Sequence, residues 1–138
     1  MGSVEAIAVS TENERLPEPV SEVDVTEEGV RGDRYFGERN LTLIEAEAIE
    51  SFVAETGIEL THAESRRQVL TRGVRLNDLV GKPFSVGEVE CVGEEWCEPC
   101  SHLEGLTRPG VLRGMVHRAG LRADIVRGGR IAVGDRVA

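Results

Sequence analysis

The sequence has little of four features that would each indicate a particular class of protein. Aromatic residues make up 4% of the chain, Lys82 is the one lysine, and there are three cysteines. No apolar run approaches the roughly 18 residues of a membrane helix, and the first residues lack the basic start of a signal peptide. An odd, small number of cysteines does not suit a disulfide framework. We therefore expect a cytoplasmic protein with reduced thiols and no membrane association.

Surplus positive charge is also missing, since the formal net charge is -9. Nucleic-acid binding needs a cationic face to neutralise phosphates, so we expect no nucleic-acid partner. The other 15 basic residues are all arginines. Adaptation to high salt and genomic codon bias both explain an acidic, lysine-poor chain, and both stay open. Arginines kept against this acidic background suit an anionic ligand, because a planar guanidinium matches phosphate geometry.

The length of 138 residues predicts one domain, residues 1–138. A domain of this size buries roughly 70% of the surface that its unfolded chain exposes. It can therefore fold without a disulfide or a metal ion. With few aromatic residues, its core must consist mainly of Val, Leu, Ile and Ala.

Apolar periodicity predicts short strands with two interspersed helices. A capping box formed by Thr42 and Glu45 predicts a helix that begins at Thr42 and ends at Gly57. A second helix is expected over residues 111–119, and a single helical turn over 76–80. The expected strands are residues 4–9, 20–25, 68–70, 84–86, 89–91, 121–127 and 131–137, the last two forming a closing hairpin. This pattern favours a mostly β fold, a small mixed β-barrel that carries helices.

Two cysteines three residues apart, Cys97 and Cys100, form the most unusual motif, with His102 close behind. A zinc site would use Cys97, Cys100 and His102, with Cys91 as an optional fourth ligand, although structural zinc usually joins two well-separated ligand pairs. A redox pair would require a helix to start at the motif and run on, which residues 109–110, Pro-Gly, oppose. The third interpretation is one reactive thiol, Cys100, presented by the turn at Pro99.

A reactive thiol at Cys100 would need cationic charge from distant parts of the chain, because a thiolate needs such charge to persist at neutral pH. Arg34, Arg66 and Arg67 are the natural candidates. The alternative in which Cys100 is a small buried apolar residue stays open.

Four segments in order resemble a known family: "GVRGDRYFG", "RRQVLTRGVRLNDLVGKPFSVGEVE", "CEPC" and "GLRADIVRGGRIAVGDRV". Together they are similar to the MOSC domain, named for the C-terminal region of molybdenum cofactor sulfurase. The resemblance covers residues 4–137 and is that of a stand-alone prokaryotic member. It implies a mixed fold like a β-barrel.

The resemblance also implies site residues. In relatives, one cysteine carries sulfane sulfur as a persulfide or binds the molybdenum of the pterin cofactor. The resemblance implies that Cys100 is the corresponding residue. In relatives, a stretch like "RRN" helps to hold the phosphate and pterin of that cofactor. It corresponds to Arg66, Arg67 and Gln68 in this sequence. Gln68 stands where Asn is usual, which lengthens the amide arm.

Three further residues complete the expected site: Asp33, Arg34 and His102. Asp33 and Arg34 could instead brace their Gly-rich loop through an ion pair, and His102 could be a rim residue. If residues 66 and 67 lie on a strand, Arg67 would face solvent while Arg66 faces the pocket.

The resemblance implies a function in molybdenum cofactor metabolism, as a sulfur carrier or a molybdenum-dependent reductase component. Sulfurase relatives join this domain to a pyridoxal-phosphate desulfurase domain, for which this chain is too short. A separate cysteine desulfurase or a molybdoenzyme is then the expected partner, with molybdopterin as the small-molecule cofactor. Two alternatives stay open: a non-catalytic module that binds an anion or a partner, and a small zinc module.

Overall fold

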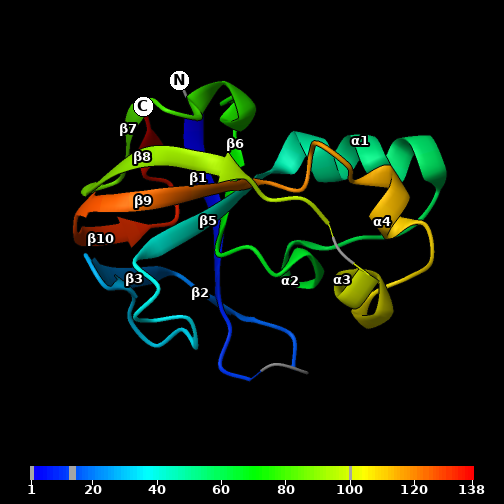
Figure 1. Cartoon of the computed structure of the whole chain (residues 1–138), viewed down its shortest axis with the longest axis horizontal. Helices are drawn as coiled ribbons and strands as arrows, with labels where there is room; N and C mark the ends of the chain where they lie inside the picture. Colours follow the sequence, from blue (N-terminus) through cyan, green and yellow to red (C-terminus); the bar gives the residue numbers. More distant parts are fainter. Residues whose placement is uncertain (1, 13–14, 100) are drawn as a thin grey trace.

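A closed β-barrel with helices gathered on one side makes up the chain (Figure 1). The computed structural model describes residues 2–12, 15–99 and 101–138, without the side chains of residues 101–103. The strands are β1 (Gly2–Val9), β2 (Glu18–Val20), β3 (Glu22–Thr26), β4 (Gly29–Val30), β5 (Asn40–Glu45), β6 (Val69–Arg72), β7 (Pro83–Val86), β8 (Val89–Trp96), β9 (Leu121–Arg127), β10 (Gly129–Ala132) and β11 (Arg136–Val137). The helices are α1 (Ala46–Thr56), α2 (His62–Ser65), the 3-10 turn η1 (Leu76–Leu79), α3 (Ser101–Leu106) and α4 (Val111–Gly114).

The barrel runs through the strand order β11-β7-β8-β9-β5-β6-β1 and closes where β11 pairs with β1. The pairing of β5 with β6 is parallel, and the other pairings around the ring are antiparallel. Closure brings the two ends of the chain together, as the terminal labels in Figure 1 show. The mostly β, mixed-barrel prediction is confirmed.

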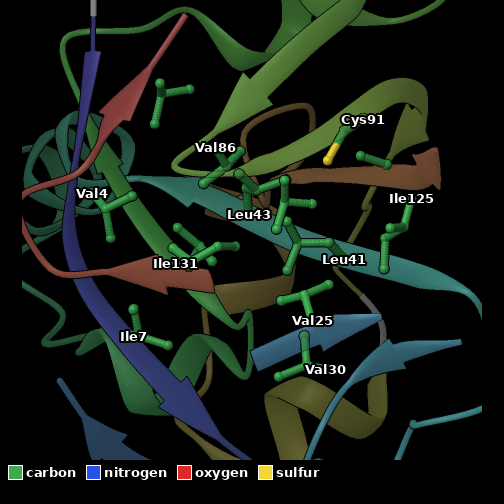
Figure 2. Packing of buried hydrophobic residues seen from close by; sticks show 14 of the residues in the cluster. Val4, Ile7, Val25, Val30, Leu41, Leu43, Val86, Cys91, Ile125 and Ile131 are labelled. Atoms are coloured by element: carbon green, nitrogen blue, oxygen red, sulfur yellow. The ribbon is translucent and has the colours of Figure 1, made fainter. Parts of the chain in front are cut away.

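The barrel interior is filled by aliphatic side chains from every part of the sheet (Figure 2). Alternation along β5 divides its residues between two cores: Leu41 and Leu43 point into the barrel, whereas Ile44 packs with Phe52 of α1 on the helical side. The barrel therefore forms a rigid wall, and residues on its outer face, such as Thr42, can build a site.

The start predicted for the first helix is wrong. Residues 40–45 form β5, and α1 begins at Ala46. Thr42 and Glu45 make a capping pattern in the sequence, but the apolar residues between them alternate, which suits a strand between β9 and β6. The predicted end is confirmed, since Gly57 adopts a left-handed conformation with φ 71° and caps α1.

Two other expectations near the C-terminus are also wrong. The strands β9 and β10 do not form a hairpin, because β9 pairs with β5 and β8 while β10 joins β3 in a second small sheet. The expected helix over residues 111–119 shortens to α4, followed by turns. In the part of the chain that the structure describes, no helix combines the length and the apolar character that crossing a membrane requires.

Candidate functional site

A cavity of about 560 Å³ opens on the outer face of the barrel. Its wall draws on β1, β5, β8 and β9, the loop that leads into β5 and the turn after α2. Segments far apart in the sequence thus meet at one place. Of the expected site residues, Asp33, Arg66, Arg67 and Gln68 line it.

Strand alternation explains why the barrel presents polar groups here. Leu41 and Leu43 fill the interior, so Thr42 between them points outward. In the antiparallel pairing of β5 with β9, Thr42 lies opposite Arg122, and both side chains line the cavity.

The arginine pair enters the wall through a tight turn rather than along a strand. A capping box between Thr61 and Glu64 starts α2, and Arg66 ends it in a left-handed conformation with φ 61°. Because residues 66 and 67 precede β6, the strand rule does not apply to them, and Arg67 lines the cavity together with Arg66. The expectation that the two would face opposite sides is corrected.

Two hydrogen bonds hold Arg67 in place. Its Nε donates to the carbonyl of Ala119 at 2.8 Å, which links the turn to the segment before β9. The ring Nε2 of His62 lies 2.8 Å from the Arg67 carbonyl, and because a carbonyl only accepts, this nitrogen carries the proton. Burial lowers the pKa of His62, against the opposing effect of that hydrogen bond, so the ring is neutral near pH 7.

Gln68 is buried, with its side chain paired to Thr42. Gln68 Oε1 accepts from the Thr42 backbone N–H at 2.9 Å and from its hydroxyl at 3.3 Å. In return, the Gln68 backbone N–H donates to Thr42 Oγ1 at 3.0 Å. The amide therefore sits in a fixed position on the cavity wall.

Asp33 braces the Gly-rich loop through the main chain. Its carboxylate accepts from the backbone N–H of Ser10 at 3.0 Å and of Tyr35 at 2.9 Å. Arg34 lies outside the group of described residues that form the wall, and its guanidinium stacks over the Tyr35 ring at 4.7 Å. The structure thus brings Asp33 to the cavity, whereas Arg34 contacts the wall residue Tyr35.

Cys97, which the sequence analysis set aside, lies in the cavity wall directly after β8. Its backbone N–H donates to the Gly120 carbonyl at 2.8 Å, and the residue is 8% exposed. Burial raises the pKa of the Cys97 thiol, while Arg67 and Arg122 act to lower it. Counting along β8 could not have placed this thiol, because the register shifts between Gly93 and Glu95.

Arg122 is a second wall residue that the sequence analysis missed. Its Nη1 pairs with Glu95 at 2.9 Å across β9 and β8. Its Nε is buried without a hydrogen-bond acceptor among the described residues. A signal was present in the sequence: Arg122 interrupts the apolar residues of the expected strand 121–127.

The remaining predictions about the cysteine motif lie partly beyond the described residues. Cys100 falls outside them, as does the side chain of His102, so both assignments stay predictions. Cys91 lies in the barrel core, 1% exposed, where burial raises the pKa of its thiol to about 12. Among the described residues no group of three His, Cys, Asp or Glu side chains could hold a metal ion.

Comparison with known proteins gives a consistent result. The family model described as "MOSC domain" matches residues 16–138. The YUAD protein from Bacillus subtilis superposes with a TM-score of 0.82 at 13% identity, covering 99% of this chain and 94% of that one. YiiM from Geobacillus stearothermophilus superposes with a TM-score of 0.77 at 15% identity, covering 100% of this chain and 74% of that one. YiiM from Escherichia coli superposes with a TM-score of 0.71 at 16% identity, covering 99% of this chain and 69% of that one. At these identities the structural matches show the fold alone. No curated protein sequence matches the chain.

Proposed function

Since the chain belongs to the MOSC domain family, we propose that the cavity binds a molybdopterin-type cofactor. We further propose that Cys100 acts beside it, either as a carrier of sulfane sulfur in the form of a persulfide or as a ligand of the cofactor's molybdenum. The family is associated with molybdenum cofactor sulfurase-like function, and the residues of the cavity support the narrower proposal.

The donor set of the wall fits the cofactor. Molybdopterin carries a phosphate and a polar fused ring, which call for guanidinium groups and amide donors. Arg66, Arg67 and Arg122 supply the former and Gln68 the latter. The volume of about 560 Å³ lies within the roughly 300–1,000 Å³ of small-molecule sites. The Arg122 Nε–H is buried and has no acceptor among the described residues. The wall therefore holds a hydrogen-bond donor that no described residue satisfies.

The observation that carries the proposal is the convergence of guanidinium groups on the cysteine segment of an acidic protein. Arg67 and Arg122 both act electrostatically on Cys97, three residues before Cys100. When bound, the cofactor supplies molybdenum, for which a thiolate is a suitable soft ligand. The proposed roles of this chain are to hold the anionic end of the cofactor with arginines and to present a thiolate to it.

In the sulfur-carrier role, the Cys100 thiolate attacks the outer sulfur of a persulfide on a separate cysteine desulfurase. A new sulfur–sulfur bond forms at Cys100 as the old one breaks, and the desulfurase cysteine leaves as a thiolate. His102 is proposed as a nearby polar group, with Asp33 keeping the loop at the cavity mouth in shape. A molybdoenzyme would then be the acceptor of the sulfur or of the cofactor.

Peptide mass mapping after incubation with a cysteine desulfurase and cysteine tests the role of Cys100. The proposal expects one added sulfur atom on the peptide bearing Cys100, which thiol reductants remove, and none in Cys100→Ser. A matched Cys97→Ser variant should still be loaded. An added sulfur on Cys97 alone would contradict the assignment.

One observation favours a second candidate, a binding module without chemistry. The described pocket thiol, Cys97, has its pKa raised by burial and is therefore protonated near pH 7. This candidate expects Cys100→Ser to bind the cofactor with unchanged affinity and to be as active in the cell as the unaltered protein. The zinc module loses Cys91 as a fourth ligand, because Cys91 is enclosed in the barrel core.

A further inference from the structure

Most of the aromatic side chains of this protein are exposed at the cavity instead of buried in the core. The chain has three phenylalanines, one tyrosine and one tryptophan. Three of these five residues, Tyr35, Phe36 and Trp96, are 47%, 43% and 42% exposed, and we call them the aromatic rim. Tyr35 and Trp96 line the cavity, and Phe36 directly follows Tyr35. Large apolar side chains gathered at one exposed place indicate contact with another molecule.

The loop that carries two of the rim residues, residues 31–39, has a fixed shape. Every main-chain N–H from residue 33 to residue 39 donates to an acceptor within the protein. The buried carboxylate of Asp33 also ties the loop to the end of β1, where it accepts from the Ser10 N–H at 3.0 Å. A loop that is already ordered loses little conformational entropy when it binds, so its exposed aromatic residues suit a docking surface.

Trp96, the third rim residue, is also held in place. Its Nε1–H donates to the Asn77 carbonyl at 3.3 Å. Its ring meets the His117 ring edge-on, with the ring centroids 5.4 Å apart. The rim is therefore a preformed surface built from a loop and from the end of β8.

The charges around the loop aromatics indicate the chemistry of the partner. The guanidinium of Arg34 lies 4.7 Å from the centroid of the Tyr35 ring, and that of Arg31 lies 5.8 Å from the centroid of the Phe36 ring. Both arginines are exposed, whereas Asp33 between them is buried against main-chain N–H groups. Tyrosine, tryptophan and arginine are the residues that most often carry the binding energy of protein interfaces.

A protein is the kind of partner that these features favour. The net charge of -9 disfavours a nucleic acid or an anionic membrane, both of which need surplus positive charge. The two exposed arginines and the adjoining rings are complementary to a protein face that carries carboxylates around an apolar depression.

Delivery of a persulfide requires contact between two proteins, because the attacking thiolate must reach the outer sulfur directly. A sulfur donor therefore has to sit at the mouth of the cavity, where the aromatic rim lies. We propose that the rim, together with Arg31 and Arg34, is the docking surface for the sulfur-donating protein, a cysteine desulfurase with carboxylates around an apolar depression on its contact face. This inference rests on the proposed function and deepens it by assigning the surface that recognises the partner.

Two sulfur donors separate docking from chemistry. A cysteine desulfurase supplied with cysteine has to dock, whereas cysteine persulfide delivers its outer sulfur without a protein surface and leaves as the cysteine thiolate. The initial rate of sulfur loading is followed by intact mass at increasing concentrations of this protein. The desulfurase experiment gives a half-saturating concentration and a rate at saturation.

Phe36→Ala tests the apolar contact, because Phe36 lies outside the described cavity wall. With the desulfurase, we expect the half-saturating concentration to rise about ten-fold and the rate at saturation to stay the same. With cysteine persulfide, loading should not change. Val133→Ala is the matched control, at a side chain that is 48% exposed in the turn after β10, and it should behave as the unaltered protein does with both donors.

Arg31→Glu tests the charge. Its half-saturating concentration for the desulfurase should also rise about ten-fold, because the reversed charge repels the carboxylates of the partner. Arg136→Glu is the control: Arg136 pairs with Ser3 near the start of β1, whereas the loop is tied to Ser10 beyond the end of that strand. Circular dichroism melting establishes that each variant is folded.

Each other outcome contradicts a definite part of the account. Unchanged half-saturating concentrations in both rim variants, or equal losses in these variants and their controls, would overturn the docking surface. Equal losses with both donors would overturn it as well, because the substitutions would then act on the thiol. Loading of the unaltered protein by cysteine persulfide but not by the desulfurase would also overturn it. Absence of loading from either donor is instead the failure of the proposed function.

Discussion

One side chain on the cavity wall, the Cys97 thiol, is kept protonated by burial. Loss of solvation raises the pKa of this thiol more than Arg67 and Arg122 lower it. Only the thiolate reacts with alkylating reagents. In a Cys100→Ser background, we expect iodoacetamide to label Cys97 slowly near pH 7 and faster as the pH rises, as followed by mass spectrometry. Rapid labelling at neutral pH would contradict a raised pKa of the Cys97 thiol.

His62 gives the fold a pH dependence. Burial lowers its pKa below the ordinary 6.5, so the unfolded chain takes up a proton at a higher pH than the folded protein does. The contribution of His62 to stability is thus complete above the ordinary pKa and is lost as the pH falls below it.

The variant His62→Gln tests this contribution, because its amide can still donate to the Arg67 carbonyl but does not titrate. We expect urea unfolding between about pH 7 and pH 5 to show a smaller loss of stability in the variant than in the unaltered protein. If stability fell equally with pH in the variant and in the unaltered protein, groups other than His62 would be responsible for the pH dependence.

At the scale of elements, the crossing of η1 over β8 depends on one glycine. A Cβ built on Gly93 would collide with the backbone carbonyl of Leu79 and press on Val80. Backbone hydrogen bonds fix this approach, since the Gly81 N–H donates to the Gly93 carbonyl at 2.7 Å. The two segments therefore cannot separate to make room for a methyl group.

We expect Gly93→Ala to destabilise the protein by about 1–3 kcal/mol, as overpacking does, measured as a lower midpoint of urea unfolding. Gly105→Ala in α3 is the matched control, because nothing lies within 4 Å of its added methyl group. The control should be neutral or slightly stabilising, since Ala favours helices over Gly. Equal effects in the two variants would contradict the close-packing argument.

Element boundaries show how far the sequence predicted the fold. The 84–91 hairpin and the Gly57 helix end were predictable, because they depend on local turn and cap geometry. The start of α1 was not, since the pattern at Thr42 suits a helix cap, and only pairing with β9 and β6 makes it a strand. The same tertiary pairing brings Arg122 opposite Thr42, which no local pattern indicates.

At the scale of the whole molecule, the barrel core dominates stability. Leu43 is fully buried in it, so Leu43→Ala should cost about 2–5 kcal/mol of unfolding free energy. Should that variant not fold, Ile131→Val, also fully buried, should cost about 0.5–1.5 kcal/mol. Leu16→Ala, at a side chain that is 54% exposed, should change stability by less than about 0.5 kcal/mol. Similar losses in the buried and exposed variants would contradict the assignment of the core.

The candidate site is a property of the closed barrel as a whole. Family resemblance led to Arg66, Arg67, Gln68 and Asp33, and the structure places all four on one cavity. Spacing along the chain could not reveal this, because closure and the turn after α2 bring these residues together. Cys97 was missed because the register of β8 shifts between Gly93 and Glu95, so that its position could not be counted along the strand.

The most direct test of the account is the molybdenum and pterin content of the protein after loading with molybdopterin cofactor. Arg67→Gln removes a cavity guanidinium, and Arg113→Gln makes the same change on the exposed side of α4. The account predicts one cofactor per chain in the unaltered protein and in Arg113→Gln, and a large loss in Arg67→Gln. Equal loading of both variants, or no loading of the unaltered protein, would contradict it.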